Sequence, residues 1–180
     1  TTSDLFAASD LPLATVSALE DFDSVFTALE NGDGHYVLGD APVLGLRASQ
    51  TAAFSPLMVT FSPENFGIAV VDDSDNELED ALNVALAAII ASGEYDAHIE
   101  AWFPGTSGTL VDTSTASTAT AYPMPTEGSA LTTVLESGTF SFCSDTTYPP
   151  FENMDSAGNA VGFSVDIASA LTDEIAEHYA

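Results

Sequence analysis

The sequence predicts an α/β fold in which a sheet rich in parallel strands is flanked by helices. From Thr1 to about Gly105, short β-rich runs alternate with segments of helical periodicity, and this alternation is typical of parallel sheets. With 180 residues and 46% hydrophobic side chains, the chain can bury a substantial core. We therefore expect one domain or the parts of two.

The expected strands are short apolar runs bounded by turn residues. They cover residues 14–18, 35–38, 67–71, 140–143 and 160–163. No segment approaches the run of about 18 apolar residues that a membrane span needs.

The expected helices carry apolar residues at helical spacing. One has Phe22, Val25, Phe26 and Leu29 and ends at Asn31-Gly32. The clearest amphipathic face closes at Gly93 and consists of Leu78, Leu82, Ala85, Leu86, Ile89 and Ile90. Shorter patterns predict a helix with Tyr95, Ile99, Trp102 and Phe103, an apolar helix over 130–135, and a last helix with Val165, Ala168, Leu171 and Ile175.

Composition divides the chain into three zones. Residues 1–105 form the first folded zone and residues 130–180 the last. Between them, residues 106–129 are rich in Thr, Ser and Ala and hold few large apolar side chains, so we expect a linker.

The charge balance restricts the partners and the medium. The chain has 28 acidic residues, a single Arg and no Lys, for a formal net charge of −27. Self-repulsion of this size destabilises a compact state unless salt screens it, so we expect a saline, cation-rich environment. Nucleic acid and anionic membrane surfaces would be repelled. We interpret the acidic residues as a solvated surface, since no calcium-loop spacing is present.

Signals of catalysis are absent from the sequence. There is no Gly-rich phosphate loop and no Gly-x-Ser-x-Gly elbow, and His35, His98 and His178 are scattered without metal-ligand spacing. We expect no enzyme, no cofactor and no metal, and we expect the histidines to be surface or packing residues. Cys143 is alone, so no intrachain disulfide forms, and its apolar surroundings predict a buried, inert thiol.

The tail of the chain carries a family resemblance. Residues 144–152 read Ser-Asp-Thr-Thr-Tyr-Pro-Pro-Phe-Glu, and Gly158 and the run Val161–Ala168 follow them. This order of strand, aromatic-Pro turn, Gly-Phe strand and helix resembles the amino-terminal signature of family 3 solute-binding proteins, the amino-acid receptors of ABC importers. The resemblance covers roughly residues 130–180.

The front of the chain resembles the other end of the same family. Residues 28–32 and 37–43 are similar to the segment with the amine-binding aspartate, and Phe66–Val70 to the strand that returns to the first lobe. Residues 93–103 are similar to the closing helix, and Thr1-Thr2-Ser3 to the loop that holds the ligand carboxylate.

The resemblance implies lobes like those of type II periplasmic binding proteins, which capture a ligand between them. Residues 1–105 would be the carboxyl-terminal portion of such a domain and residues 130–180 the amino-terminal portion of one. The order is reversed and the middle portion is absent. Circular permutation, a tandem array of receptor domains and a swap with a neighbouring chain all account for this order.

A zwitterionic amino acid requires an anion, hydrogen-bond donors and an apolar surface. The resemblance implies that Asp40 pairs with the ammonium, that Thr1 and Thr2 hold the carboxylate, and that Tyr148 and Phe151 form an aromatic wall. Asp145 would meet a polar or cationic ligand side chain. The competing interpretations are a turn at Asp40, helix capping near Thr2 and packing of the aromatic residues.

Two further charged residues receive no ligand role. Asp166 is expected to stabilise the start of its helix. Arg47 is the only Arg in the chain, and it lies in an unrelated helical stretch. It should not replace the family's carboxylate-binding arginine, which belongs to the absent middle portion.

The function expected from the resemblance is extracytoplasmic binding of a small polar solute, an amino acid, with delivery to an ABC permease. The protein would be periplasmic, cell-surface or secreted. The alternative is a structural subunit of an extracellular filament or surface array that reuses this fold and associates with itself. Ligand-dependent thermal stabilisation would separate the two.

Overall fold

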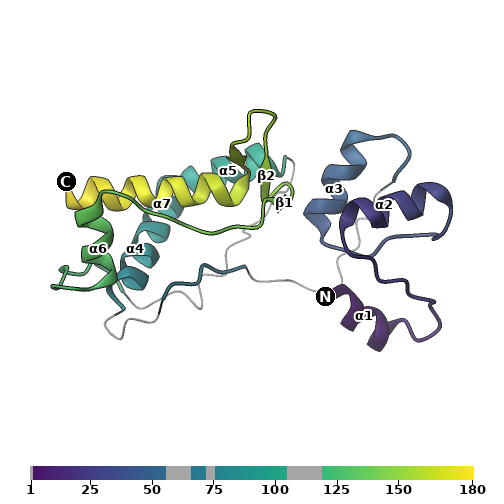
Figure 1. Ribbon diagram of the computed structural model, residues 1–180, viewed down its shortest axis with the longest axis horizontal. Helices are drawn as coiled ribbons and strands as arrows, with labels where there is room; N and C mark the ends of the chain where they lie inside the picture. Colours follow the sequence, from purple (N-terminus) through teal and green to yellow (C-terminus); the bar gives the residue numbers. More distant parts are fainter. Residues whose placement is uncertain (1, 56–65, 72–75, 105–118) are drawn as a thin grey trace. The chain divides into compact units, whose positions relative to one another are not determined.

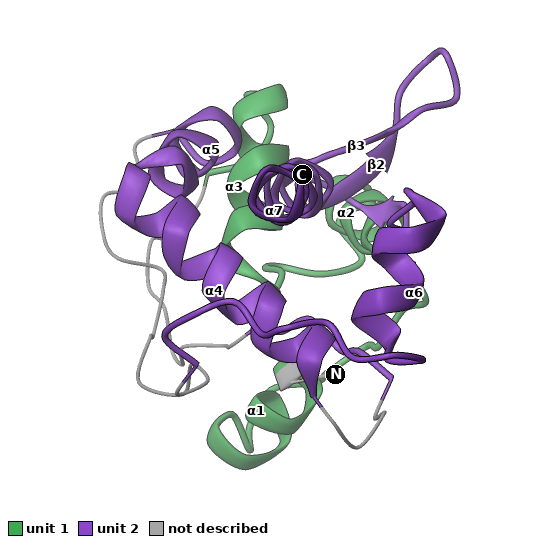
Figure 2. Cartoon of the chain, turned by 90° about the vertical axis from the view of Figure 1, so that its left-hand side faces the viewer, with its two compact units in different colours: residues 1–61 green, residues 62–180 purple. Residues whose placement is uncertain are grey.

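A computed structural model describes residues 2–55, 66–71, 76–104 and 119–180. The chain forms two compact units, residues 1–61 and residues 62–180, which Figure 2 distinguishes by colour. Each unit has its own helices and its own buried residues, and each is described by itself.

The fold is mostly helical, so the predicted α/β fold with lobes rich in parallel strands is wrong. The described residues contain seven helices and one small antiparallel sheet, with strand order β1-β2-β3 (Figure 1). Of the predicted strands, only residues 160–163 overlap an observed one. A strand requires neighbours that bond its N–H and C=O groups, and the predicted runs at 14–18, 35–38, 67–71 and 140–143 have no such ladder.

The first unit contains α1 (Thr2–Asp10), α2 (Phe22–Asn31) and α3 (Ala41–Gln50). Asp21 caps α2, because its carboxylate accepts a hydrogen bond of 2.7 Å from the Ser24 N–H. Gly32 ends the helix with a left-handed φ of 81°, which confirms the predicted stop at Asn31-Gly32.

Phe26 is the centre of the small core in this unit. Its ring lies 6.2 Å from that of Phe22 and 5.4 Å from that of Phe54, measured between centroids. The guanidinium of Arg47, on α3, lies 5.3 Å from the Phe26 centroid, a cation–π contact that joins α3 to α2. Arg47 therefore has a packing role within this unit.

The second unit contains four helices: α4 (Glu77–Ser92), α5 (Glu94–Trp102), α6 (Ala130–Ser137) and α7 (Phe163–Tyr179). Helix α4 contacts the other three, and α5 also contacts α7. In Figure 2, α7 is seen nearly end-on, with α4 and α5 on one side and α6 on the other. The amphipathic patterns predicted for α4, α5, α6 and α7 are confirmed as helices.

The core of the second unit is a cluster shared by α4, α6 and α7. Its buried members are Ala81, Leu82, Ala85, Ile89, Leu131, Ile167, Ala170, Leu171 and Ile175. Ile89 and Leu131 are the largest side chains that are almost wholly enclosed. Burial of one such side chain contributes about 1.5–3 kcal/mol, so this cluster is the main source of stability in the unit.

Residues 119–129 pack along the helices of the second unit. The buried carboxylate of Glu77 accepts hydrogen bonds from Thr126, 2.6 Å from its hydroxyl and 3.0 Å from its N–H. These bonds from Thr126, together with one from Ser129, hold the pKa of Glu77 below its usual value. The Tyr179 hydroxyl donates to the carbonyl of Pro123 at 2.6 Å. The rest of the predicted linker, from 106 to 118, lies outside the described residues.

Tyr122 is held in the same segment by the end of α7. Its ring stacks on His178 with centroids 3.9 Å apart, and its hydroxyl donates to Glu174. Burial, with Glu174 close by, raises the pKa of Tyr122 to about 12. This tyrosine is therefore an uncharged donor throughout the physiological range.

The sheet is a compact meander before α7. Strands β1 (Thr147–Tyr148), β2 (Glu152–Met154) and β3 (Ala160–Val161) pair in antiparallel fashion. In the loop between β2 and β3, the Asp155 carboxylate accepts hydrogen bonds from the N–H groups of Ala157 and Asn159, each 2.8 Å long. These bonds lower the pKa of Asp155, with Asn159 the main cause. The sheet presents the turn between β1 and β2 to the N-terminal end of α7.

Candidate functional site

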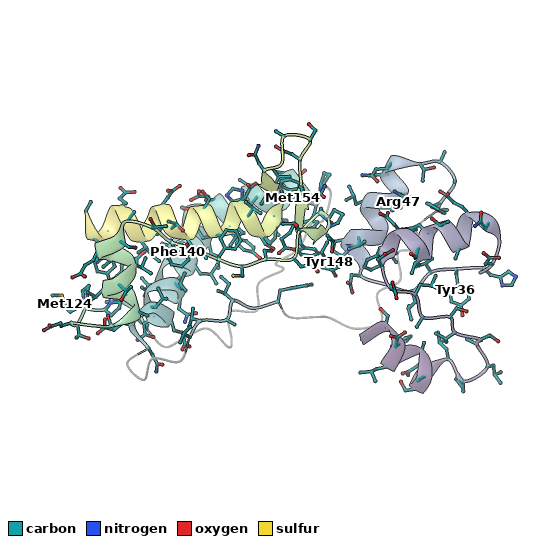
Figure 3. The ribbon with its side chains drawn as sticks, in the orientation of Figure 1. Tyr36, Arg47, Met124, Phe140, Tyr148 and Met154 are labelled. Atoms are coloured by element: carbon teal, nitrogen blue, oxygen red, sulfur yellow. The ribbon has the colours of Figure 1, made fainter. Side chains whose placement is uncertain are left out.

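The turn between β1 and β2 places two of the predicted ligand residues in contact. The rings of Tyr148 and Phe151 stack with centroids 5.3 Å apart and an interplanar angle of 11°. Tyr148 is half-buried, and Figure 3 labels it beside the small sheet. The predicted aromatic pair thus exists as one stacked unit.

Phe151 is the hub of an aromatic cluster. Its ring lies 4.8 Å from Phe66 and 5.3 Å from Phe103, and it is only 7% exposed. Phe66, by contrast, is 65% exposed. Phe151 is therefore the buried centre of the cluster, while Tyr148 and Phe66 provide its accessible aromatic surface. The contact of Phe66 with this cluster was not predicted from the sequence, because Phe66 lies 85 residues before Phe151 and no local pattern links it to this turn.

The turn is fixed to the first residues of α7. The N–H of Phe163 donates to the carbonyl of Pro150, and the N–H of Ser164 donates to the carbonyl of Phe151, each at 3.0 Å. Two N–H groups at the helix start thus find partners in the turn. Gly162, with a φ of 140°, stands where the backbone of Phe151 leaves no room for a side chain. The aromatic cluster is consequently held on a rigid support.

Asp145 lies just before β1 and is exposed. Its Oδ1 accepts hydrogen bonds from the Thr147 hydroxyl at 2.7 Å and from the Thr147 N–H at 3.0 Å. The hydroxyl bond, followed by the N–H bond, lowers the pKa of Asp145, so this carboxylate stays charged even in mildly acidic solution. The structure thus places a fixed negative charge three residues before Tyr148.

The remaining predicted ligand residues belong to the first unit. Asp40 is the N-cap residue of α3, where its carbonyl accepts from Leu44 and its side chain makes no capping bond to that helix. Thr2 is the first residue of α1. Thr1 and the side chain of Thr2 lie outside the described part of the chain. A hollow of about 420 Å³ in this unit is lined by other residues, from Asp10 to Ala14 and Tyr36.

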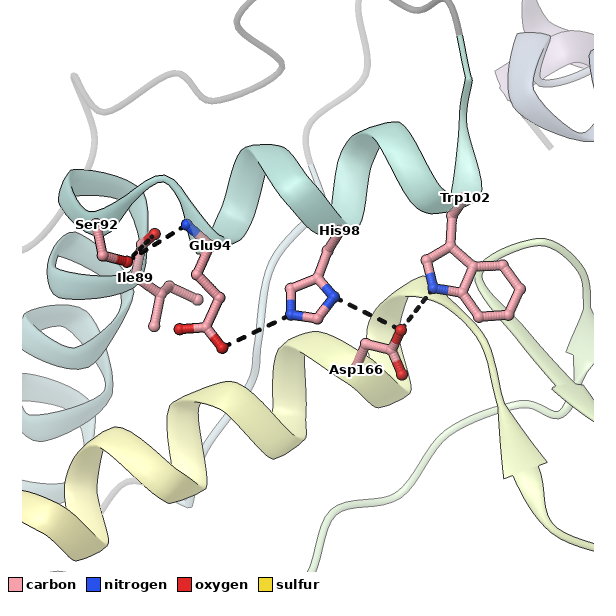
Figure 4. Close-up of polar contacts among 6 residues, drawn as sticks. All are labelled: Ile89, Ser92, Glu94, His98, Trp102 and Asp166. Atoms are coloured by element: carbon pink, nitrogen blue, oxygen red, sulfur yellow. Dashed lines mark hydrogen bonds and ion pairs between the residues drawn. The ribbon is translucent and has the colours of Figure 1, made fainter.

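A polar cluster joins α5 to α7 beside the aromatic one (Figure 4). Asp166 Oδ2 accepts a hydrogen bond of 2.7 Å from Trp102 Nε1 and lies 3.6 Å from His98 Nδ1. His98 Nε2 is 3.9 Å from Glu94 Oε1. Asp166 lies in the first turn of α7, as expected for a helix-stabilising residue, and it also holds α5. This cluster was not predicted from the sequence; the four-residue spacing of Glu94, His98 and Trp102, which places them on one face of α5, is the signal that could have indicated it.

Cys143 is exposed, so the predicted burial of this thiol is wrong. The prediction assumed a strand with a covered face, and residues 140–143 are not part of the sheet. His178 packs on Tyr122, and His98 lies between two carboxylates. In the described ranges, no three His, Cys, Asp or Glu side chains are grouped to hold a metal ion.

Comparison with protein-family models, with curated proteins and with solved structures finds no match to this chain. The resemblance of residues 28–43 and 144–168 to family 3 solute-binding proteins therefore stays a prediction from the residues. No helix in the described part is long and apolar enough to cross a membrane.

Proposed function

We propose that this chain is part of an extracytoplasmic binding protein that takes up a small polar solute, an amino acid, for an ABC-type importer. The observation that carries the proposal is the Tyr148–Phe151 stack, which follows a hydrogen-bonded carboxylate at Asp145. The resemblance of the surrounding residues to family 3 receptors supports the same function.

The chemistry of this surface favours an amino acid with an apolar, aromatic or cationic side chain. Partly exposed aromatic rings at Tyr148 and Phe66 offer area for stacking, and an ammonium or guanidinium over such a ring gains a further cation–π attraction. Asp145 adds a fixed negative charge nearby in the chain. An anionic solute would be repelled by this carboxylate and by the formal charge of −27.

Within the first unit, the resemblance implies that Asp40 pairs with an ammonium and that Thr2 holds a carboxylate, and these roles are proposed for that unit by itself. Their test is independent of the aromatic cluster, because they belong to the other compact unit. An Asp40→Asn variant should weaken binding of every amino acid alike, since all of them share the ammonium group.

The experiment is a thermal-unfolding screen of the chain against the common amino acids in molar KCl. A ligand that binds only the folded protein stabilises it by about 2.7 kcal/mol at one hundred times its Kd. Tyr148→Ala and Asp145→Asn should reduce the stabilisation by the best ligand. Tyr36→Ala and Asp173→Asn change exposed residues of the same two types outside the cluster, and they should leave the stabilisation unchanged.

Two results would reject the proposal. One is the absence of any shift in the unfolding midpoint with every amino acid at millimolar concentration. The other is a shift that Tyr148→Ala, Asp145→Asn and Asp40→Asn all leave intact, because binding would then occur elsewhere.

A further inference from the structure

His98 lies between two carboxylates where α5 packs against α7 (Figure 4). Its Nδ1 is 3.6 Å from Asp166 Oδ2 on α7, and its Nε2 is 3.9 Å from Glu94 Oε1 on its own helix. Nε2 is shielded from solvent and has no hydrogen-bond partner among the described residues. The other two histidines have different surroundings, because His35 is exposed and His178 stacks on a tyrosine ring.

This position suits a protonated ring better than a neutral one. A neutral imidazole has one N–H, so it can donate toward only one of the two carboxylates. Its other nitrogen then directs a lone pair at the second carboxylate, and the two repel each other. A protonated ring has an N–H on each nitrogen and a positive charge, so it can pair with Glu94 and Asp166 together.

The other titratable groups of α5 do not compete for His98. Asp96 and Glu100 are each two residues from it, and residues at that spacing do not face each other on a helix. Tyr95 is three residues away and packs edge-on against a phenylalanine of α7. Burial raises the pKa of Tyr95, so this side chain stays uncharged at neutral pH.

The helices packed against α5 contribute one charged group at this point. Residues 83–92, the half of α4 that leads into α5, contain no titratable side chain, and the acidic residues of α4 lie in its first turn. On α7, Asp166 faces His98. The remaining acidic residues of α7 lie at least seven residues further along: Asp173, Glu174 and Glu177.

We propose that protonation of His98 fastens α5 to α7, so that this contact tightens as the pH falls below neutrality. Histidine side chains ordinarily gain a proton near about pH 6.5, and carboxylates near about pH 4. The stabilisation is therefore present between these values and is lost as the pH rises through the histidine range. It needs no solute, so it does not depend on the proposed function.

The His98 contact lies next to the support of the aromatic cluster. Phe103 follows the last residue of α5 and Phe163 is the first residue of α7, and their rings are 5.2 Å apart. Both rings also contact Phe151, the hub of the cluster. Attachment of α5 to α7 therefore steadies the packing around Phe151, and a rise in pH weakens it.

Thermal unfolding in molar KCl, followed by circular dichroism at pH 5.5 and at pH 8, gives the first test. Between these two values the carboxylates that face His98 stay charged. On going from pH 8 to pH 5.5, the unfolding midpoint of the unmodified chain should rise relative to that of His98→Gln. Glu94→Gln replaces the carboxylate at Nε2 by a neutral amide, so it should lose part of the same rise.

Two matched variants control for the loss of one imidazole and one carboxylate. His35→Gln removes an exposed histidine, and Glu100→Gln removes an exposed carboxylate on the other side of α5. Both should respond to pH like the unmodified chain. The same response in His98→Gln as in the unmodified chain would overturn the proposal. A response that Glu94→Gln leaves intact would also overturn it, because the second carboxylate is essential to the argument.

Amide exchange of the unmodified chain gives a test that no folding defect can confuse. The protection factors of the α5 amides, corrected for the intrinsic effect of pH on exchange, should be larger at pH 5.5 than at pH 8. The protection factors in α6, on the other side of α7, should change by a smaller factor. Equal changes in the two helices would mean that the whole unit responds, which contradicts a specific contact between α5 and α7.

Discussion

Glu77 shows how a single carboxylate can act as a structural bridge. It is buried, and it accepts hydrogen bonds from the backbone and side chain of Thr126, 49 residues away. Acidic residues of this chain were interpreted as a solvated surface, so this bridge could not be predicted from composition. Its partner is distant in sequence, and no local pattern marks it.

The pH dependence of stability should report the Glu77 bridge. Since its pKa is lowered in the folded state, its contribution is present above the unfolded pKa and is lost as the pH falls through the folded value. Glu77→Gln should therefore lower the unfolding midpoint at pH 7, and the difference from the unmodified chain should shrink at pH 3. Thermal unfolding of the variant and the unmodified chain in molar KCl, at pH 7 and at pH 3, measures these midpoints. Glu79→Gln, exposed on the same helix, is the control and should behave like the unmodified chain.

Gly162 supports the aromatic turn. A Cβ at this position would overlap the carbonyl of Phe151, and the φ of 140° is unfavourable for any other residue. Gly162→Ala should cost on the order of 1–3 kcal/mol in unfolding free energy. Gly158→Ala, at a φ of 85° with open space around it, should cost less. Denaturant titration measures the unfolding free energy of both variants. Equal losses of unfolding free energy would show that the overlap with Phe151 does not contribute to stability.

At the scale of elements, most helices were predictable and, apart from the one at 160–163, the strands were not. The apolar spacing in α4 and the stops at Gly32 and Gly93 are local signals, and helical hydrogen bonds are local as well. A strand depends on neighbours that a short apolar run cannot specify, so residues 67–71 and 140–143 fail as strands although their composition is typical of them. For the same reason, the local pair Tyr148–Phe151 was predicted, whereas the contact of Trp102 with Asp166 was not.

The packing of α4 against α7 should dominate the stability of the second unit. Ile89 is 1% exposed in the core between these helices. Ile89→Ala should destabilise the unit by about 2–5 kcal/mol, the usual range for an enclosed aliphatic side chain. Ile68→Ala, at a position 61% exposed, should change the unfolding free energy by less than about 0.5 kcal/mol. Urea unfolding followed by circular dichroism checks this, and similar losses would contradict the assigned core.

For the whole molecule, charge should make folding depend on salt. The formal charge of −27 is screened over about 10 Å at 0.1 M salt and about 3 Å at 1 M. The unfolding midpoint should therefore rise steadily between these concentrations. Differential scanning calorimetry in KCl and in NaCl tests this, and equal curves in the two salts identify screening rather than a specific cation. A midpoint that is independent of salt would argue against the saline environment inferred from composition.

The hydrogen bond from Trp102 to Asp166 makes tryptophan fluorescence sensitive to the packing of α5 against α7. Trp102 is the only tryptophan, and its indole N–H joins α5 to a helix 64 residues further along. If α5 separated from α7, the indole of Trp102 would become exposed to solvent. Its fluorescence emission maximum would then shift to longer wavelength, even if every helix stayed intact. Tryptophan fluorescence can therefore follow the packing of α7 against α5 in the unmodified chain, without any added label.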